Sequence, residues 1–148
     1  MEPTTTGRRP TAIIADDHVE VHPLLCRILE SEIEVLENVF DGQALVDAAV
    51  RLHPDLIVVD IVMPGLDGIE AVKRIKERSS AVAVVFISTD AAEDNVQRAL
   101  KTGARAFVRK ASAAEHLLPA ARAALLGLTF VSGKPEGNCC CSKNLQKR

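Results

Sequence analysis

The sequence predicts an α/β domain in which helices cover both faces of a doubly wound, five-stranded parallel sheet. Three observations lead to this class. Five short apolar runs alternate with longer segments of helical periodicity, which is the pattern of successive β-α units. Glycine, proline and aspartate separate these units. Hydrophobic residues make up 47% of the 148-residue chain, which is enough to build one buried core.

The strands are recognised as runs of apolar and β-branched residues bounded by polar or turn-forming ones. In chain order they are expected at 12–16, 33–40, 55–60, 82–88 and 105–110. The run DLIVVD (55–60) is the most continuous, which is typical of a central parallel strand covered on both faces. The proline- and glycine-rich segment MPGLDG (63–68) follows it as a loop.

The helices are recognised from apolar residues that repeat at helical spacing. In chain order they are expected at 19–32, 43–52, 69–77, about 91–101 and about 113–126. The first helix has an apolar stripe made of Val21, Leu24, Leu25, Ile28 and Leu29. Pro23 and Pro119 are each expected to remove one helical hydrogen bond and to introduce a mild kink.

Turn and capping residues indicate where the helices begin and end. Asp41-Gly42 is expected to form the turn before the second helix, and Gly103-Ala104 the turn before the fifth strand. His53 ends the second helix, because a residue that precedes proline avoids the α-helical region. Ser112 and Glu115 match a capping box at the start of the last helix.

The β-α pattern occupies residues 11–127, and residues 1–10 and 128–148 are expected to be flexible ends. The C-terminal segment is too short to form a helix-turn-helix unit, so no output domain is expected. Cys26 is expected to be a small buried side chain. Cys139–Cys141 are consecutive and lack the C-x-x-C spacing of a zinc site, so we expect them to be disordered thiols.

Composition argues against several classes of protein. A formal net charge of −2 gives no indication of a broad nucleic-acid-binding surface. No apolar run approaches the roughly 20 residues of a membrane-spanning helix, and the first residues lack the apolar stretch of a signal peptide. The protein is therefore expected to be soluble and cytoplasmic.

Four of the predicted strands end in side chains that are able to do chemistry. The first ends in Asp16 and Asp17, the third in Asp60, the fourth in Ser88 and the fifth in Lys110. Each of these alone is commonly a helix cap, a turn residue or a solvated charge. Because ligands of parallel sheets bind beyond the carboxyl ends of the strands, we expect the five side chains to converge.

Such a cluster suits phosphoryl transfer. Three carboxylates repel one another and favour a hard cation such as Mg²⁺, which can neutralise charge as it develops. One carboxylate can act as the nucleophile and form an aspartyl phosphate, while Lys110 and Ser88 contact phosphoryl oxygens. In this reaction class, positioning and electrostatics provide most of the catalysis.

The chain resembles the receiver domain of two-component response regulators over residues 11–127, on the segments IIADDH, VVDIVMPGLDG and KTGARAFVRK. The likeness is to the CheY-like superfamily, and most to its NarL/FixJ branch. It implies a flavodoxin-like (βα)5 fold with strand order 2-1-3-4-5, and Asp60 as a phosphoacceptor assisted by Ser88 and Lys110. The implied magnesium ligands are Asp16, Asp17, Asp60 and the backbone carbonyl of Val62, and the implied switch residues are Ser88 and Phe107.

The resemblance also implies partners. A sensor histidine kinase or a phosphotransfer protein donates the phosphoryl group, and the receiver catalyses its own phosphorylation and dephosphorylation without being a turnover enzyme. Output is expected toward a downstream protein or a second copy of the chain. The output face would be made by the fourth helix, fifth strand and fifth helix, which carry Arg98, Lys101, Arg105 and Glu115. No membrane partner and no direct nucleic-acid binding are expected.

Some positions depart from the family pattern. Phe107 lacks a hydroxyl group, so any switching by ring rotation must rely on packing alone. Thr89 follows Ser88 where alanine is usual, and Ala111 follows Lys110 where proline is common. If the Lys110–Ala111 bond is cis, as in the family, it costs about 3 kcal/mol without proline.

The sequence argues against two rival enzyme classes and leaves two other interpretations open. A phosphohydrolase would need a second Asp two positions after Asp60, where Val62 stands, and a nucleotide-binding enzyme would need a glycine-rich phosphate loop that the sequence lacks. A degenerate receiver would only dock other proteins. The chain could also be the regulatory part of a shortened NarL/FixJ-type DNA-binding transcription regulator.

Overall fold

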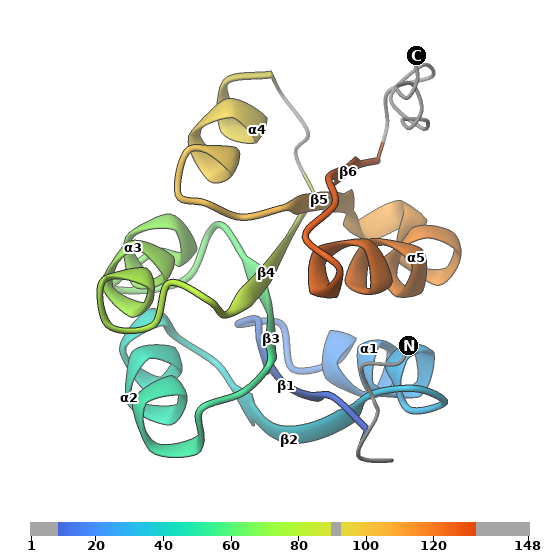
Figure 1. The fold of residues 1–148 in the computed structure, drawn as a ribbon, viewed down its shortest axis with the longest axis horizontal. Coiled ribbons are helices and arrows are strands. Elements are labelled where there is room, and N and C mark those ends of the chain that lie inside the picture. Colours follow the sequence, from blue (N-terminus) through green and yellow to red (C-terminus); the bar gives the residue numbers. More distant parts are fainter. Residues whose placement is uncertain (1–8, 90–92, 133–148) are drawn as a thin grey trace.

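A computed structural model describes residues 9–89 and 93–132 of the chain. Within them lies a six-stranded sheet in the order β2-β1-β3-β4-β5-β6, and every neighbouring pair is parallel (Figure 1). The strands are β1 (Thr11–Ala15), β2 (Glu34–Val39), β3 (Leu56–Asp60), β4 (Ala83–Ser88), β5 (Ala106–Arg109) and β6 (Phe130–Val131). The predicted doubly wound α/β class and the order 2-1-3-4-5 are confirmed, and β6 is an addition to the predicted five strands.

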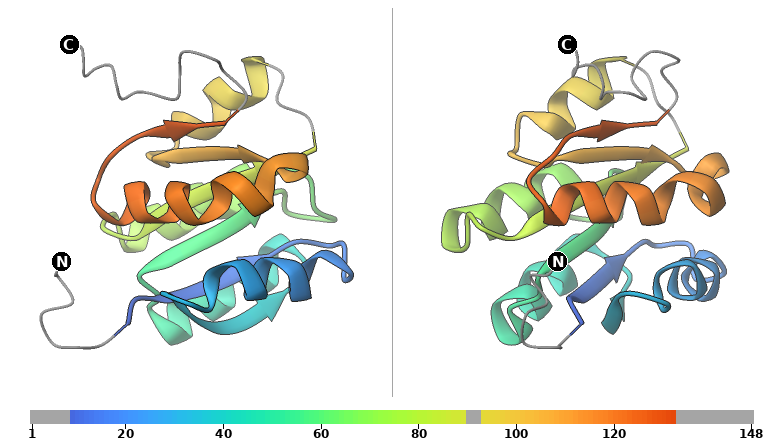
Figure 2. Two further views of the ribbon diagram at one scale, coloured as in Figure 1. Left: turned by 90° about the vertical axis from the view of Figure 1, so that its right-hand side faces the viewer. Right: turned by 45° about the vertical axis from the view of Figure 1, so that its right-hand side comes forward.

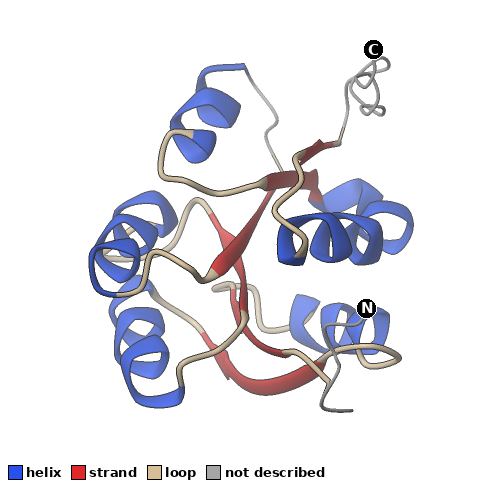
Figure 3. Ribbon diagram, viewed as in Figure 1, coloured by secondary structure: helices blue, strands red, loops and turns tan. Residues whose placement is uncertain are grey.

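Helices cover both faces of the sheet. They are α1 (Val21–Leu29), α2 (Gly42–Leu52), α3 (Gly68–Arg78), α4 (Glu93–Leu100) and α5 (Ala113–Leu125), with a short 3-10 turn, η2 (Lys110–Ser112), before α5. α1 and α5 lie side by side on one face, and α2, α3 and α4 cover the other (Figures 2 and 3). None of the helices in the described residues combines the length and apolar character needed to cross a bilayer.

The central strands supply side chains to both helical layers, because successive residues of a strand point to opposite faces. In β1, Ile13 packs in the layer of α2, α3 and α4, whereas Ile14 packs in the layer of α1 and α5. Ile57 and Val58 of β3 divide between the layers in the same way. Every residue of β1 and β3 is buried, which explains why their sequences are nearly continuous apolar runs.

Two aspartates fix the starts of helices beside the carboxyl edge of the sheet. Asp41 caps α2 by accepting the backbone N–H of Ala44 at 2.8 Å, and Asp67 caps α3 by accepting that of Glu70 at 2.9 Å. α2 ends before His53, as predicted, and His53 adopts a left-handed conformation with φ of 49°.

α1 is shorter than the predicted 19–32, and its buried side differs from the predicted stripe. Leu24 is 49% exposed, whereas His22 is buried. Burial of a histidine is tolerated here because both ring nitrogens have oxygen partners. Nε2 lies 2.7 Å from the backbone carbonyl of Asp16, and Nδ1 lies 2.8 Å from Asn38 Oδ1.

Three further local predictions need correction. Pro23 stands in the first turn of α1, where a backbone N–H has no helical partner, so it removes no helical hydrogen bond. Ser112 makes no side-chain cap, because η2 leaves it at φ −107° and ψ 12° instead of the extended conformation of a capping residue. Cys26 is half-buried at the margin of the α1 and α5 layer, not fully buried.

β6 extends the sheet beyond the predicted end of the domain at residue 127. Phe130 N–H donates to the Arg105 carbonyl at 3.0 Å, and Ser132 N–H donates to the Phe107 carbonyl at 2.8 Å. The flexible segment predicted from residue 128 is therefore wrong for β6. The predictions for residues 1–8 and 133–148, including Cys139–Cys141, lie outside the described residues.

Candidate functional site

The candidate site lies at the carboxyl edge of the sheet. Asp16 and Asp17 directly follow β1, Asp60 is the last residue of β3, and Lys110 directly follows β5. Because the strands are parallel, their ends meet at one edge, and the structure brings these four side chains together as expected. Ser88, the last residue of β4, is buried at the same edge.

Lys110 is the positive centre of this cluster. Its Nζ lies 2.8 Å from Asp16 Oδ2 and 3.0 Å from Asp60 Oδ2, and the side chains of Lys110, Asp16 and Asp60 are only 12%, 0% and 5% exposed. Close pairing offsets part of the cost of burying these charges. Asp16 Oδ2 is ion-paired with Lys110 but receives no hydrogen bond of favourable geometry from any described residue.

The surroundings shift the pKa values of the paired groups. Burial raises the pKa of Asp60, Lys110 opposes this shift without cancelling it, and the negative charge of Asp16 adds to it. Burial acts to lower the pKa of Lys110, but close pairing with the carboxylates of Asp16 and Asp60 outweighs it and raises that pKa. Lys110 therefore stays a cation at neutral pH, next to a carboxylate whose charge is only partly compensated.

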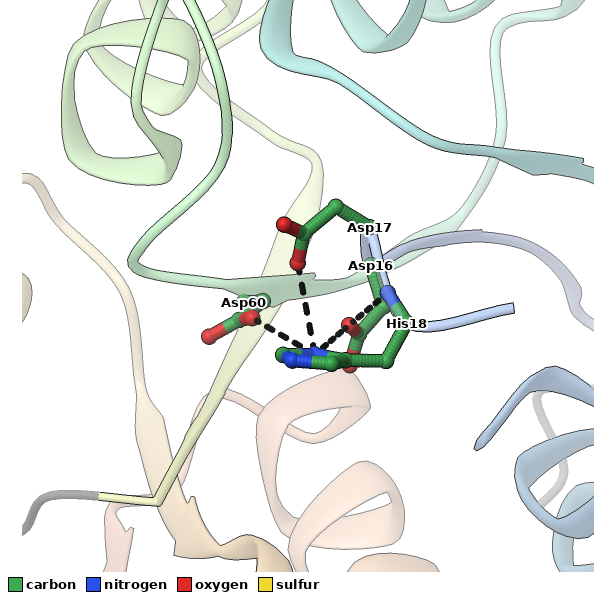
Figure 4. Close-up of side chains that lie close together, drawn as sticks. All are labelled: Asp16, Asp17, His18 and Asp60. Carbon is green, nitrogen blue, oxygen red and sulfur yellow. Dashed lines mark hydrogen bonds and ion pairs between the residues drawn. The ribbon is translucent and has the colours of Figure 1, made fainter. Parts of the chain in front are cut away.

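Sequence reasoning missed His18, whose ring lies among the three carboxylates (Figure 4). His18 Nδ1 is 3.0 Å from Asp16 Oδ1, 3.3 Å from Asp17 Oδ1 and 4.0 Å from Asp60 Oδ2. The backbone N–H of His18 donates to the same Asp16 Oδ1 at 2.9 Å, which folds the residue back over the site. The available signal was its place directly after the acidic pair.

The donor set fits a hard divalent cation. One donor atom each from Asp16, Asp17, His18 and Asp60 lie within 4.8 Å of one another, close enough to surround a single ion. Carboxylate oxygens are the ligands that Mg²⁺ prefers, and a cation would relieve the repulsion between the acidic groups. The backbone carbonyl of Val62 stays a predicted further ligand, because none of the contacts among the described residues involves it.

Comparison with known proteins decides the family. Residues 12–122 match the family model of the response regulator receiver domain. The chain belongs to this family. The receiver is 35% identical over 127 residues to the transcriptional regulatory protein LiaR of Bacillus subtilis, covering 84% of the chain and 60% of LiaR. It is 34% identical over 98 residues to the chemotaxis protein CheY of Halobacterium salinarum, covering 66% of the chain and 82% of CheY.

A solved structure has the same fold. The crystal structure of a LuxR-family two-component response regulator from Aurantimonas superposes with a TM-score of 0.80 at 24% identity, covering 88% of this chain and 94% of that one. The receiver is also 31% identical over 124 residues to the nitrate/nitrite response regulator protein NarL of Escherichia coli, covering 82% of the chain and 57% of NarL, so it is most like the NarL/FixJ branch, as predicted. The receiver chain spans about 60% of the length of LiaR.

The predicted switch residues lie on the two neighbouring strands β4 and β5 of the receiver. Phe107 is fully buried and pairs in register with Phe86, so its ring is part of the core. Ser88 pairs with Arg109, one residue before Lys110. The Lys110–Ala111 bond is trans, like every other peptide bond in the described residues.

Gly68 sets how closely α3 approaches the end of β3. Its N–H donates to the Ile61 carbonyl at 2.8 Å, and a Cβ at this position would lie 2.0 Å from the Asp60 carbonyl oxygen. Only glycine allows this approach. The helix start therefore packs directly on the backbone of the predicted phosphoacceptor.

We expect Asp60→Asn to make the receiver more stable at neutral pH, measured in a chelating buffer. The substitution removes a buried charge that Lys110 compensates only in part. The gain should be about 1 kcal/mol, the usual size of a single-residue effect, or roughly 3 °C in Tm for a chain of this length.

The gain should also depend on pH. Because the pKa of Asp60 is raised on folding, the wild type loses stability as pH rises from the unfolded pKa through the folded one. The variant lacks this loss, so its advantage should shrink in acid. Thermal unfolding followed by circular dichroism at several pH values tests this. A lower Tm for Asp60→Asn at neutral pH would mean that the Lys110 ion pair outweighs the cost of burial.

Proposed function

We propose that this receiver accepts a phosphoryl group on Asp60 and transmits the signal by changing its protein contacts. The observation that carries the proposal is the 3.0 Å ion pair between Lys110 and Asp60, set within the acidic cluster at the carboxyl edge of the sheet. A fixed cation beside a reactive carboxylate can also neutralise the oxygens of an incoming phosphoryl group.

The reaction would convert Asp60 into an acyl phosphate. An Asp60 carboxylate oxygen attacks the phosphorus of a phosphohistidine, the phosphorus–nitrogen bond breaks, and the departing imidazole takes up a proton. Lys110 holds the acceptor carboxylate and reduces its repulsion with Asp16. When bound by Asp16, Asp17 and Asp60, Mg²⁺ would supply further charge neutralisation.

The proposed donor is a sensor histidine kinase or a phosphotransfer protein, and the proposed location is the cytoplasm. Receiver domains are generally phosphoacceptors, not turnover enzymes. For the output we propose the surface formed by α4, β5 and α5, which would contact a downstream protein or a second copy of the chain. Its exposed charged residues include Arg98, Lys101, Arg105 and Glu115.

A second candidate concerns the whole protein. LiaR is named a transcriptional regulatory protein, and this chain spans 60% of its length. The chain would then be the regulatory receiver of a NarL/FixJ-type DNA-binding regulator. The chemistry proposed for Asp60 is the same in both cases, and only the output differs.

Intact-mass spectrometry after incubation with a small phosphodonor tests the proposed function. We expect one phosphoryl adduct that forms with Mg²⁺, is suppressed by a chelator, and is stable in acid and labile in base. No adduct on the wild-type chain, or equal adduct with chelator present, would contradict the proposal.

Ser88→Ala should separate phosphorylation from its readout. Ser88 is buried at the end of β4, where a hydroxyl can move toward a new phosphoryl group. The variant should still accept the phosphoryl group, yet show at least about tenfold weaker phosphate-dependent dimerisation or partner binding. Analytical ultracentrifugation with and without beryllofluoride measures the dimerisation.

Thr89→Ala is the matched control for Ser88→Ala, because it removes the neighbouring hydroxyl from an exposed position. We expect this control to dimerise like the wild type. If Ser88→Ala and Thr89→Ala behave alike, the Ser88 hydroxyl does not couple the phosphoryl group to the output face.

A further inference from the structure

His18 is the member of the acidic cluster to which the proposed phosphoryl transfer gives no role. Its side chain is 51% exposed, so burial in the core does not dictate its position. It nevertheless lies over the carboxylates and directs Nδ1 toward all three of them (Figure 4). A ring on an exposed position that turns inward to this degree is held there by the polar groups of the site.

The distances around His18 Nδ1 match the ligand spacing of an octahedral metal ion. With metal–ligand distances of about 2.1 Å, adjacent ligands lie about 3.0 Å apart and opposite ligands about 4.2 Å apart. Nδ1 lies 3.0 Å from Asp16 Oδ1 and 3.3 Å from Asp17 Oδ1, which fit adjacent positions. It lies 4.0 Å from Asp60 Oδ2, which fits an opposite position.

The contacts of His18 Nδ1 with protein groups are mutually inconsistent. Nδ1 also lies 3.1 Å from Lys110 Nζ, which is a hydrogen-bond donor. If Nδ1 carries a proton, this donor faces the donor group of Lys110, which is unfavourable. If Nδ1 carries a lone pair, this acceptor faces the oxygens of Asp16 and Asp17, which is also unfavourable. A divalent cation between the lone pair and the oxygens would make the contacts with Asp16 and Asp17 favourable, and the Lys110 ammonium would then pair with the carboxylates alone.

Two hydrogen-bonding contacts hold the backbone around His18 in place. The buried His22 ring contacts the Asp16 carbonyl through Nε2 at 2.7 Å, and Asp16 Oδ1 accepts the His18 backbone N–H at 2.9 Å. The turn that carries Asp16, Asp17 and His18 is thus anchored to α1. His18 therefore presents its ring to the site from a fixed backbone.

We propose that His18 Nδ1 is a direct ligand of the divalent cation, so that the site binds first-row transition ions such as Mn²⁺ in preference to Mg²⁺. The inference rests on the proposed function, because it concerns the same metal site. Imidazole nitrogen is a good ligand for first-row divalent ions, whereas Mg²⁺ prefers oxygen. His18 thereby determines metal selectivity, while the carboxylates determine that a cation binds.

Electron spin echo measurements on Mn²⁺-loaded protein test this directly, because they detect a nitrogen nucleus bound to the ion. Mn²⁺ is the suitable probe, since it binds poorly to thiolates and the chain has four cysteines. The wild type should show a nitrogen coupling that His18→Ala abolishes. Calorimetry should show about tenfold weaker Mn²⁺ binding in His18→Ala, and Mg²⁺ binding changed by less than about twofold.

His53→Asn is the matched control, because it removes an exposed imidazole far along the chain and asparagine tolerates the left-handed conformation there. It should keep the nitrogen coupling and both affinities. Absence of the coupling in Mn²⁺-loaded wild type, or equal loss of Mn²⁺ and Mg²⁺ binding in His18→Ala, overturns the inference.

The outcome is distinguishable from failure of the proposed function. Phosphoryl acceptance is measured on the wild-type chain by its Mg²⁺-dependent adduct, separately from the nitrogen coupling to Mn²⁺. If the adduct forms but no nitrogen couples to Mn²⁺, the His18 inference alone is wrong. If the wild type neither binds Mn²⁺ nor forms the adduct, both proposals are wrong.

Discussion

Asp60→Asn should reduce phosphoryl acceptance from a small donor by at least about 100-fold, because an amide oxygen is a poor nucleophile and cannot form an acyl phosphate. Asp60 is the carboxylate that ends the central strand β3 and pairs with Lys110 at 3.0 Å. Intact-mass spectrometry over a time course with Mg²⁺ measures the effect.

The same variant should be more stable than the wild type, so loss of the adduct could not be attributed to unfolding. Asp47→Asn is a suitable control, since Asp47 is an exposed residue of α2 outside the cluster. It should be phosphorylated like the wild type. If Asp60→Asn is phosphorylated to the wild-type extent, a residue other than Asp60 is the phosphoacceptor.

The approach of the acidic and basic side chains could be predicted from sequence because it depends on strand direction alone. Asp60 ends an apolar run that is buried on both faces, so its position followed once the run was recognised as a central parallel strand. Asp16 and Lys110 stand at corresponding places after β1 and β5. A parallel sheet brings such residues to one edge whatever the loops do.

The position of His18 could not be predicted in the same way. A residue three places beyond a strand can point toward the site or toward solvent, and the hydrogen bond from its own N–H to Asp16 Oδ1 decides which. The burial of His22 could not be predicted from the sequence for a similar reason. Its partners are the Asp16 carbonyl and Asn38 of β2, and sequence periodicity cannot show a partner on another strand.

The short strand β6 was missed because its stability is tertiary. Two residues are too few for a strand pattern, and the sequence around Phe130 is rich in turn-forming and polar residues. The segment is held by hydrogen bonds to the backbone of Arg105 and Phe107, and by Ser132, whose Oγ lies 3.0 Å from His116 Nδ1. These partners are distant in sequence, and they lie beside β6 only because α5 leads the chain back to the sheet.

The largest effect on stability is expected from Gly68→Ala. A Cβ at Gly68 would lie 2.0 Å from the Asp60 carbonyl oxygen and 3.1 Å from Ile61 Cα. Both are backbone atoms, so no side chain can rotate to relieve the overlap, and α3 must shift away from the end of β3. We expect a loss of about 3 kcal/mol in the free energy of unfolding, at the upper end of overpacking costs.

Gly65→Ala is the matched control, because the same loop is changed by the same methyl group without a clash. Nothing lies within 4 Å of a Cβ there, and only the left-handed φ of +71° opposes alanine. That conformation should cost about 1 kcal/mol. Urea unfolding followed by circular dichroism gives both values, and the loss in Gly68→Ala should exceed that in Gly65→Ala by about 2 kcal/mol.

Gly68→Ala should also weaken the site, since the displaced helix start rests on the carbonyl of Asp60 itself. Mn²⁺ binding should therefore fall in Gly68→Ala under conditions where the variant is still folded, and stay at the wild-type level in Gly65→Ala. Equal stability of the two variants would show that moving α3 costs no more than placing alanine at the left-handed position of Gly65. In that case the close approach of α3 to β3 would not be what holds Asp60 in position.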